Sequence, residues 1–332
     1  MKIKKFAPIL LFVFNRPAHT KAVLKSLKDN SFSKSSKLYI FSDNYKFEKD
    51  KKNVKEVRKI INKFKGFKSI QIINRKVNYG LSKSIRLGIK LILKKHDSFI
   101  VLEDDIVTSK NFIIYMNRCL QKYKKNKNIW HIGAWNYPMF KINDNKDVYF
   151  DRMMNCWGWA TWKENWKKTE FNAQRFINKF SKKKIIKFNL DGVENFWSHL
   201  LLNKYKIINT WAIFWFLTIS SNNGLCVRPK KSLSRNIGID GSGINCQKPL
   251  FSFYNLQKLE KFFPKKFRIT NKEDRKSIEQ IKKFYQLENL FLLRYINKIY
   301  EKLFNIFNQK IENTNRQRLK EYNLEMKKIF KN

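Results

Sequence analysis

The stretch that most constrains this chain is residues 98–105, which read Ser-Phe-Ile-Val-Leu-Glu-Asp-Asp. Its four consecutive apolar residues, two of them β-branched, predict a short strand that is buried on both faces. Three carboxylates follow this strand directly. Neighbouring carboxylates repel one another and resist losing their hydration, so they need a compensating positive charge. A hard divalent cation that carries phosphates would supply it, and the alternative is a solvated loop with a helix cap.

The rest of the first 135 residues predicts an α/β fold with a mostly parallel sheet. Four further apolar runs have the length of strands. They lie at residues 8–14, 38–41, 69–73 and 129–133, and helical patterns separate them. Strands and helices that alternate at this spacing predict a parallel sheet with helices on both faces.

Polar side chains follow three of these strands at the point where each strand ends. The three loops contain Asn15 and Arg16, Asp43 and Asn44, and the acids at 103–105. Ligands of open α/β sheets bind beyond the carboxyl ends of the strands, so these loops predict one shared crevice. The first loop has no Gly-x-Gly-x-x-Gly motif, P-loop or Gly-rich basic sequence, which argues against a classical dinucleotide site and against nucleotidyltransferases.

The charge of the chain is extreme. Its 332 residues include 71 basic and 26 acidic side chains, which gives a formal net charge of +45. Such a charge suggests nucleic acid, an anionic membrane surface or an acidic substrate as a partner. Because the excess is mostly lysine spread along the whole chain, and arginine, the better reader of bases, is scarce, we expect no nucleic-acid partner.

The cysteines and the apolar runs indicate where the protein works. The four cysteines are far apart in sequence, so a zinc site is not expected. No signal peptide is visible, and the apolar run at 211–219 is too short to span a bilayer. We expect a cytoplasmic protein with reduced thiols, either free or attached to the inner face of the cell membrane.

Aromatic residues become frequent past residue 133. Residues 156–162 read Cys-Trp-Gly-Trp-Ala-Thr-Trp, and residues 211–216 read Trp-Ala-Ile-Phe-Trp-Phe. Such clusters form hydrophobic cores or flat faces for sugars, and we expect some of these tryptophans in the core. Residues 236–246 contain three glycines and Asp240. This segment is either a loop that closes over a ligand or an ordinary surface loop.

The end of the chain predicts a helix from about residue 272 onwards. Apolar residues recur there at three- or four-residue spacing, with Lys and Arg between them. Three interpretations remain open: a helix that packs on the domain, a coiled-coil partner helix, or a basic amphipathic helix that lies on anionic lipid.

Six short motifs occur in a characteristic order. They are Asn15-Arg16, Ser42-Asp43, Glu103-Asp104-Asp105, the segment 129–136 (Ile-Trp-His-Ile-Gly-Ala-Trp-Asn), Gly158-Trp159 and Arg228-Pro229. Together they resemble the animal N-acetylglucosaminyltransferase I family and its bacterial relatives among the surface-polysaccharide sugar transferases. The bacterial branch is the more similar, through the segments 157–162, 223–225 and 236–238. The resemblance covers roughly residues 8–246.

The resemblance implies a GT-A glycosyltransferase domain over residues 1–250. Its nucleotide-sugar half would be residues 1–135 and its acceptor half residues 136–250, followed by a basic amphipathic helical extension at 251–332. The resemblance also implies an inverting hexosyl- or N-acetylhexosaminyl-transferase with a nucleotide-diphosphate sugar, a UDP-sugar preferred, as donor. Mn²⁺ or Mg²⁺ would be the cofactor, and a glycan or lipid-linked molecule of surface polysaccharide synthesis the acceptor. The alternative is an inactive transferase-like protein that binds a glycan or a partner.

The resemblance also assigns roles to individual residues. Asp105 would bind the metal, Asp104 the ribose, and Glu103 would orient that network. The other predicted donor and acceptor contacts are Asn15 and Arg16 at the diphosphate, Asp43 or Asn44 at the base, Trp135, Asn136, Gly158 and Trp159 around the sugar and acceptor, and Arg228. A cation at these acids suits the chemistry, because the leaving nucleotide diphosphate carries a growing negative charge.

The general base is the missing part of the motif set. The family is expected to have an acid beside Trp211, where this chain has Asn-Thr-Trp-Ala at 209–212 and therefore no carboxylate. The bacterial relatives tend to have a histidine where this chain has Asn245. We therefore predict Glu194 as the first candidate for the base and Asp240 as the second.

Overall fold

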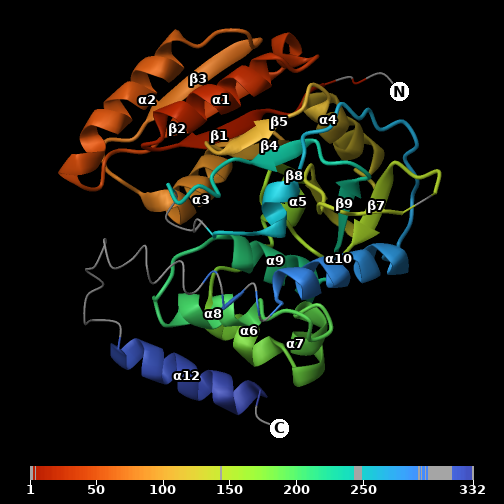
Figure 1. Cartoon of the computed structure of the whole chain (residues 1–332). Helices are drawn as coiled ribbons and strands as arrows, with labels where there is room; N and C mark the ends of the chain where they lie inside the picture. Colours follow the sequence, from red (N-terminus) through yellow and green to blue (C-terminus); the bar gives the residue numbers. More distant parts are fainter. Residues whose placement is uncertain are drawn as a thin grey trace.

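An eight-stranded sheet runs through the centre of the computed structural model (Figure 1). The structure describes residue 3 and residues 5–142, 144–242, 249–290, 292, 294, 295, 297 and 316–330. In sheet order the strands are β3 (Ser69–Asn74), β2 (Lys37–Ser42), β1 (Ile9–Val13), β4 (Ser98–Glu103), β8 (Trp159–Trp162), β6 (Ile129–Gly133), β9 (Leu225–Pro229) and β7 (Val148–Asp151). A separate two-stranded ribbon joins β5 (Ile106–Thr108) to β10 (Ser234–Asn236).

The predicted α/β class is confirmed. All five predicted strands are present, and β3, β2, β1 and β4 run parallel to one another. The sequence Trp-Ala-Thr-Trp, which we predicted only as an aromatic cluster, forms the antiparallel strand β8 between β4 and β6. Since β7 is also antiparallel to its neighbour β9, the sheet is mixed in its second half. This arrangement is consistent with the GT-A fold that the resemblance implies.

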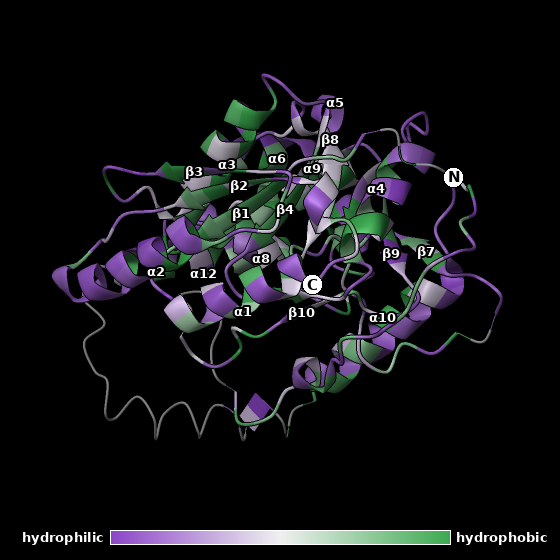
Figure 2. Ribbon diagram, turned by 90° about the horizontal axis from the view of Figure 1, so that it is seen from above, coloured by the Kyte–Doolittle hydropathy of each residue, from purple (hydrophilic) through white to green (hydrophobic). Residues whose placement is uncertain are grey.

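Helices cover both faces of the sheet, with α1 and α2 on one face and α3 on the other (Figure 1). The helices of the first half are α1 (Pro17–Lys28), α2 (Lys51–Lys63), α3 (Gly80–Ile92) and α4 (Phe112–Lys122). Those that follow are α5 (Lys163–Trp166), α6 (Ala173–Lys179), α7 (Lys182–Phe188), α8 (Trp197–Lys204), α9 (Ala212–Ser221), α10 (Arg275–Glu288) and α12 (Arg316–Phe330). Figure 2 shows that hydrophobic residues gather in the central strands, whereas the outlying helix α2 is mostly hydrophilic.

The central strands are buried on both faces, which explains their continuous apolar runs. In β1, Ile9 and Leu11 pack with α1 and α2, whereas Leu10 and Phe12 pack with α3. Successive side chains of a strand point to opposite faces, so a strand covered on both sides needs apolar residues at every position. This packing fixes the carboxyl ends of β1, β2 and β4 side by side.

Helix α9 lies between two hydrophobic clusters. Trp215 and Ile219 pack against the sheet with α3, while Phe216 and Leu217 pack against α6, α7 and α8. A helix that is apolar all round is expected to be buried on all sides, as α9 is. The predicted aromatic segment at 211–216 is therefore a core helix.

The C-terminal helices pack on the domain, the first of the three interpretations. Ile278, Ile281 and Phe284 of α10 are buried in the same cluster as α6, α7 and α8. Helix α12 packs against that cluster through partly buried side chains, and Glu325 pairs with Lys204 of α8 at 2.7 Å. The apolar stripe of α10 is thus turned inward, which contradicts the idea that it lies on lipid. Residues 298–315 fall outside the described ranges, and the predicted domain limits stay a prediction.

Within the described ranges, none of the helices combines the length and the apolar character needed to cross a bilayer.

Candidate functional site

The three consecutive acids lie at the carboxyl end of the parallel strands, as predicted. Glu103 is the last residue of β4 and is paired in register with Phe12 of β1. Asp104 and Asp105 form the turn into β5 and are only 4% and 5% exposed. Two buried carboxylates beside a partly buried one require positive charge close by.

Arg16 supplies part of that charge. It follows β1 and caps the N-terminus of α1, and one of its guanidinium nitrogens, Nη2, donates to both Asp104 and Asp105. The Nη2–Oδ2 distance to Asp105 is 3.0 Å, and the backbone N–H of Phe14 donates to the other oxygen of Asp104 at 3.2 Å. The second terminal nitrogen of Arg16, Nη1, is buried without a hydrogen-bond partner within the described residues. We call Arg16, Glu103, Asp104 and Asp105 the acid–arginine cluster.

The pKa values of the cluster reflect an excess of negative charge. Burial, followed by the charges of Asp105 and Asp104, raises the pKa of Glu103 to about 8, although Arg16 and a hydrogen bond from the Trp211 side chain act in the opposite direction. Burial also raises the pKa of Asp105, against the effect of Arg16. The raised pKa values of Glu103 and Asp105 indicate that the cluster has room for further positive charge.

The residues present fit a cation that arrives together with phosphate. Among the described residues, no group of three or more His, Cys, Asp or Glu side chains forms a complete metal site. Mg²⁺ is usually held by one or two carboxylates together with substrate phosphates, so an all-protein cage is not required. Asp104 and Asp105 offer hard oxygen ligands of this kind, and the unpartnered Nη1 of Arg16 is a donor for an anion.

The glycine-containing loop after β10 lies directly on the cluster. The backbone N–H of Ile237 donates to the carbonyl of Asp105 at 2.9 Å. A Cβ atom at Gly238 would lie only 2.4 Å from Oδ2 of Asp105 and 3.0 Å from Nη1 of Arg16, so no side chain fits there. Asp240, two residues further on, pairs with His19 of α1 at 3.1 Å. Residues 237–240 therefore lie against the acid–arginine cluster, and closure of this loop over a ligand stays a prediction. Residues 243–246 of the segment lie outside the described ranges.

Asp43 and Asn44 occupy the neighbouring loop after β2. The carboxylate of Asp43 accepts the backbone N–H groups of Tyr79, at 2.9 and 3.1 Å, and of Gly80, at 2.9 Å. These N–H groups belong to the N-terminus of α3, where a carboxylate is favourable. The Asn44 side chain donates to the Lys76 carbonyl at 2.6 Å. Both residues therefore fix this loop, and their predicted contact with a base stays a prediction.

Asn15 lies next to Arg16 but turns toward another residue. Its side-chain amide donates to Oδ1 of Asp50 at 2.8 Å, in the short 3₁₀ turn Glu48–Asp50 before α2. Arg16 therefore contacts the acids, whereas the side chain of Asn15 contacts the turn that precedes α2.

The residues predicted for the sugar and acceptor side are buried in this conformation. Trp135 and Trp159 are 1% and 0% exposed, and Trp159 stacks between His131 and Trp211 with ring centres 5.5 and 5.1 Å away. Asn136 donates to the carbonyl of Lys230 at 2.8 Å. Their burial indicates structural roles, and their contact with a sugar stays a prediction.

Gly158 precedes β8 in a conformation that favours glycine. Its φ is +81°, and an added Cβ would lie 3.1 Å from the Phe112 ring. The close packing around this turn explains why glycine stands here between two tryptophans.

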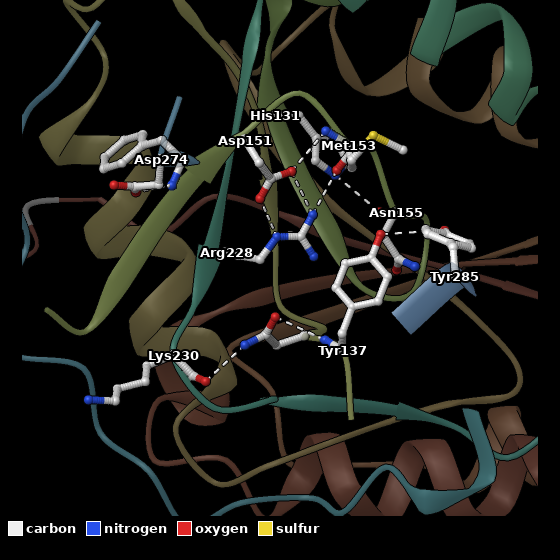
Figure 3. A network of polar contacts seen from close by, with 12 residues as sticks. His131, Tyr137, Asp151, Met153, Asn155, Arg228, Lys230, Asp274 and Tyr285 are labelled. Atoms are coloured by element: carbon white, nitrogen blue, oxygen red, sulfur yellow. Dashed lines mark hydrogen bonds and ion pairs between the residues drawn. The ribbon is translucent and has the colours of Figure 1, made fainter. Parts of the chain in front are cut away.

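Arg228 is held in the interior by an acid that the sequence did not single out as its partner (Figure 3). Its guanidinium pairs with Asp151, which is fully buried at the end of β7, and also donates to the carbonyl of Met153 at 2.9 Å. The guanidinium carbon lies 4.8 Å from the centre of the Tyr137 ring. These contacts favour a structural role for Arg228 over the predicted contact with the donor. The pairing links residues 77 positions apart, so no local pattern could reveal it.

The two candidate bases lie in different places. Glu194 is half-buried in the loop before α8, and its Oε1 accepts from the side chain of Asn289 at the end of α10. No contact links it to the acid–arginine cluster among the described residues. Asp240 is on the loop that covers this cluster, is 45% exposed at its side chain, and accepts from the backbone and hydroxyl of Ser242. Burial raises the pKa of Asp240 slightly, but the hydrogen bonds from Ser242 and the charge of His19 outweigh it and lower that pKa.

Trp211 contacts a member of the predicted acid triplet. Its side chain, at the N-terminus of α9, hydrogen bonds Glu103 of β4. The two residues are far apart in sequence, so no local pattern indicated this contact, and the identity of the general base stays a prediction.

Comparisons with known proteins give partial similarities. No protein-family model matches the chain, and no curated protein matches its sequence. Among solved structures, the chain is similar to the mannosyltransferase PcManGT from Pyrobaculum calidifontis in complex with GDP-Man and Mn²⁺, with a TM-score of 0.35 and 7% identity over 49% of this chain and 46% of that one. It is also similar to TarS of S. aureus, with a TM-score of 0.29 and 12% identity over 43% of this chain and 24% of that one. The chain thus spans about half of the first structure and a quarter of the second.

Proposed function

We propose that this chain is a metal-dependent inverting glycosyltransferase. It would move a hexosyl or N-acetylhexosaminyl group from a nucleotide-diphosphate sugar, a UDP-sugar preferred, to a glycan or lipid-linked acceptor of surface polysaccharide synthesis. The reaction would take place at the inner face of the cell membrane with Mn²⁺ or Mg²⁺. The observation that supports this proposal is the acid–arginine cluster, in which three carboxylates meet one guanidinium at the carboxyl ends of parallel strands.

The charge balance of the cluster favours a cation together with a diphosphate. Arg16 offsets one of the two carboxylates that it contacts, so Asp104, Asp105 and Arg16 leave one negative charge. A divalent cation would turn this into one positive charge, which would then attract an anion such as a diphosphate.

Each residue of the cluster would have a distinct role. Asp105, with Asp104 beside it, would hold the cation, and Asp104 would also reach the ribose. When bound, the cation supplies charge stabilisation to the departing nucleotide diphosphate. Arg16 would donate from its unpartnered Nη1 to a phosphate oxygen, and Gly238 would let the loop backbone lie close to the diphosphate and exclude water.

The proton of the acceptor hydroxyl needs a base within about 2.6–3.2 Å or through one water. We infer that Asp240 suits this role better than Glu194, because Asp240 lies on the loop over the cluster. The alternative, an inactive transferase-like protein that binds a glycan or a partner, draws support from the fact that both acids already accept hydrogen bonds.

A thermal-shift experiment tests donor binding. The protein is melted with a panel of nucleotide sugars, each with and without Mn²⁺. A true donor at one hundred times its Kd should add about 2.7 kcal/mol of stability, and only with the metal. Asp105→Asn should lose this shift, whereas Asp29→Asn, an exposed control at the end of α1, should keep it. An equal shift in both variants would remove Asp105 from the metal site, and tight binding with neither transfer nor hydrolysis would favour the inactive alternative.

A further inference from the structure

The outer face of α3 combines exposed leucines with basic side chains. Its inner face, which includes Ile85, Ile89 and Ile92, packs against the sheet. On the outer face Leu87 and Leu91, which lie one turn apart, are 36% and 42% exposed. The basic residues Lys83, Arg86 and Lys90 lie beside these leucines on the helix, Lys94 follows its end, and all four are exposed.

A groove of about 800 Å³ runs between α3 and the segment around α5. Six cationic residues line it, namely Lys83, Arg86, Lys90, Lys94, Lys163 and Lys167, and within the described part of the chain no Asp or Glu lines it. Leu87, Leu93, Trp166 and Phe171 supply its apolar surface. The guanidinium carbon of Arg86 lies 4.0 Å from the centre of the Phe171 ring, which holds this cation over the groove.

The surrounding charges neutralise little of this surface. Glu164, an exposed neighbour on α5, lies 3.5 Å from Lys167 and offsets that one lysine. Lys83 lies 4.6 Å from the centre of the Tyr79 ring, a contact that leaves its charge intact. The α3 surface, which we define as Leu87, Leu91 and the six cations of the groove, is therefore strongly positive.

The geometry points to a bilayer rich in anionic phospholipid as the partner of the α3 surface. The cations from residue 83 to residue 90 extend over about 10 Å of helix, with Lys94 just past its end, and do not converge on one point, which suits many headgroups better than a single phosphate. Leucines between basic residues are typical of helices that lie in a membrane interface, where the leucines enter the acyl boundary and the lysines reach the headgroups. A soluble polyanion would be bound by the charges alone and gives no reason for the leucines.

Helix α2 shows what a merely basic helix looks like in this protein. It has the same length of 13 residues, and its exposed residues include Lys52, Lys55 and Lys63. Of its apolar residues, Val54, Val57 and Ile61 are buried and Ile60 is partly buried, so its outer face has no exposed apolar side chain. Helix α2 therefore serves as a control that distinguishes specific docking through α3 from the general attraction of a chain with a net charge of +45 to anionic surfaces.

Docking through α3 would also orient the crevice. The N-terminus of α3 donates to Asp43, so this helix begins at the loop next to the acid–arginine cluster. A bilayer on the α3 surface would therefore lie close to the crevice, within reach of a lipid-linked acceptor. Only this last consequence rests on the proposed function, since vesicle binding needs neither donor nor metal.

Co-sedimentation with vesicles tests the inference on the full chain. The vesicles contain phosphatidylglycerol and phosphatidylcholine, or phosphatidylcholine alone. The variants are Lys83→Gln/Lys90→Gln/Lys94→Gln on α3 and, as matched control, Lys52→Gln/Lys55→Gln/Lys63→Gln on α2. Each basic residue near an anionic surface changes the partition coefficient by about fivefold, so the α3 variant should bind anionic vesicles about a hundredfold more weakly. The α2 variant should bind almost as the unmodified protein does.

A third variant, Leu87→Ser/Leu91→Ser, tests the apolar part of the α3 surface. It should weaken binding to the same vesicles while the net charge is unchanged, and far-UV circular dichroism should show that each variant is folded. Equal weakening by the two lysine variants, or no anionic-vesicle binding by the unmodified protein, would overturn the inference. Undiminished vesicle binding by the leucine variant, together with tight binding of an RNA that depends on the α3 lysines, would point to a nucleic-acid partner instead.

Discussion

Acid should destabilise this protein through the buried His131. Nε2 of this residue lies 3.0 Å from the carbonyl oxygen of Asn155, and Nδ1 lies 3.2 Å from Nε1 of Trp215 (Figure 3 shows the first contact). Because the carbonyl accepts and the indole N–H donates, these partners assign a neutral ring with its proton on Nε2. A second proton on Nδ1 would face the N–H of Trp215. Burial lowers the pKa of His131 to about 3, with the charge of Arg228 acting in the same direction and the bond to Asn155 opposing it.

The sign and size of the effect follow from linkage. In the unfolded chain a histidine takes up a proton below pH 6.5, whereas the folded protein resists it until about pH 3. The contribution of the neutral His131 to the free energy of unfolding is therefore present above pH 6.5 and is lost as the pH falls toward 3. The slope approaches about 1.4 kcal/mol per pH unit below pH 6.5, so about 2.7 kcal/mol is lost between pH 7.5 and 4.5. That is a large part of a typical unfolding free energy of about 5–15 kcal/mol.

The assay is urea unfolding of the protein and of His131→Gln at pH 4.5, 5.5, 6.5, 7.5 and 8.5. The glutamine amide can accept from Trp215 and donate to Asn155, but it does not titrate in this range. Other acids titrate in both proteins and cancel in the difference. The stability of the unmodified protein relative to the variant should fall by about 2.7 kcal/mol between pH 7.5 and 4.5 and stay constant above pH 7.5. Parallel stability curves between pH 4.5 and 6.5 would refute the reasoning.

Three further changes test other contacts. Gly238→Ala forces a Cβ to within 2.4 Å of an Asp105 carboxylate oxygen, so it should cost about 1–3 kcal/mol of stability or of Mn²⁺-dependent donor binding. In the control Gly133→Ala the nearest contacts of the added Cβ would be 3.8 Å away, so this variant should lose less stability in urea unfolding and less donor affinity in calorimetry. Equal losses in the two variants would contradict the packing of the loop on the acids. Asp151→Asn removes the carboxylate charge opposite a buried guanidinium and should cost about 3–5 kcal/mol in urea unfolding, so a loss below about 1 kcal/mol would speak against that pair. Glu325→Ala breaks the ion pair of α12 with α8 and should make α12 more sensitive to limited proteolysis while the melting temperature of the rest changes little; unchanged cleavage would show that this pair does not hold the helix.

The sequence predicted those parts of the fold that depend on local pattern. Strands β1 and β4 were predicted because a strand covered on both faces must be apolar throughout, and the acids after β4 stand out against such a run. Their meeting with Arg16 also followed, since the carboxyl ends of neighbouring parallel strands share one edge.

The parts that depend on distant partners could not be predicted in this way. The four residues of β8 become a strand through pairing with β4 and β6, and their aromatic character alone gave no strand signal. The pairing of Arg228 with Asp151 and the contact of Trp211 with Glu103 join distant segments. The apolar stripe of α10 has the same pattern whether it meets lipid or the domain, and only the position of the neighbouring helices α6 to α8 decides between them.

The most direct test of the proposed function measures the release of nucleoside diphosphate from the donors that stabilise the protein, with an acceptor extract present. The account predicts release that requires Mn²⁺ or Mg²⁺, stops on chelation, and falls by at least about a hundredfold in Asp105→Asn while Asp29→Asn retains it. Release that continues undiminished after chelation and in Asp105→Asn, or a protein that neither binds nor cleaves any nucleotide sugar with metal, would contradict it.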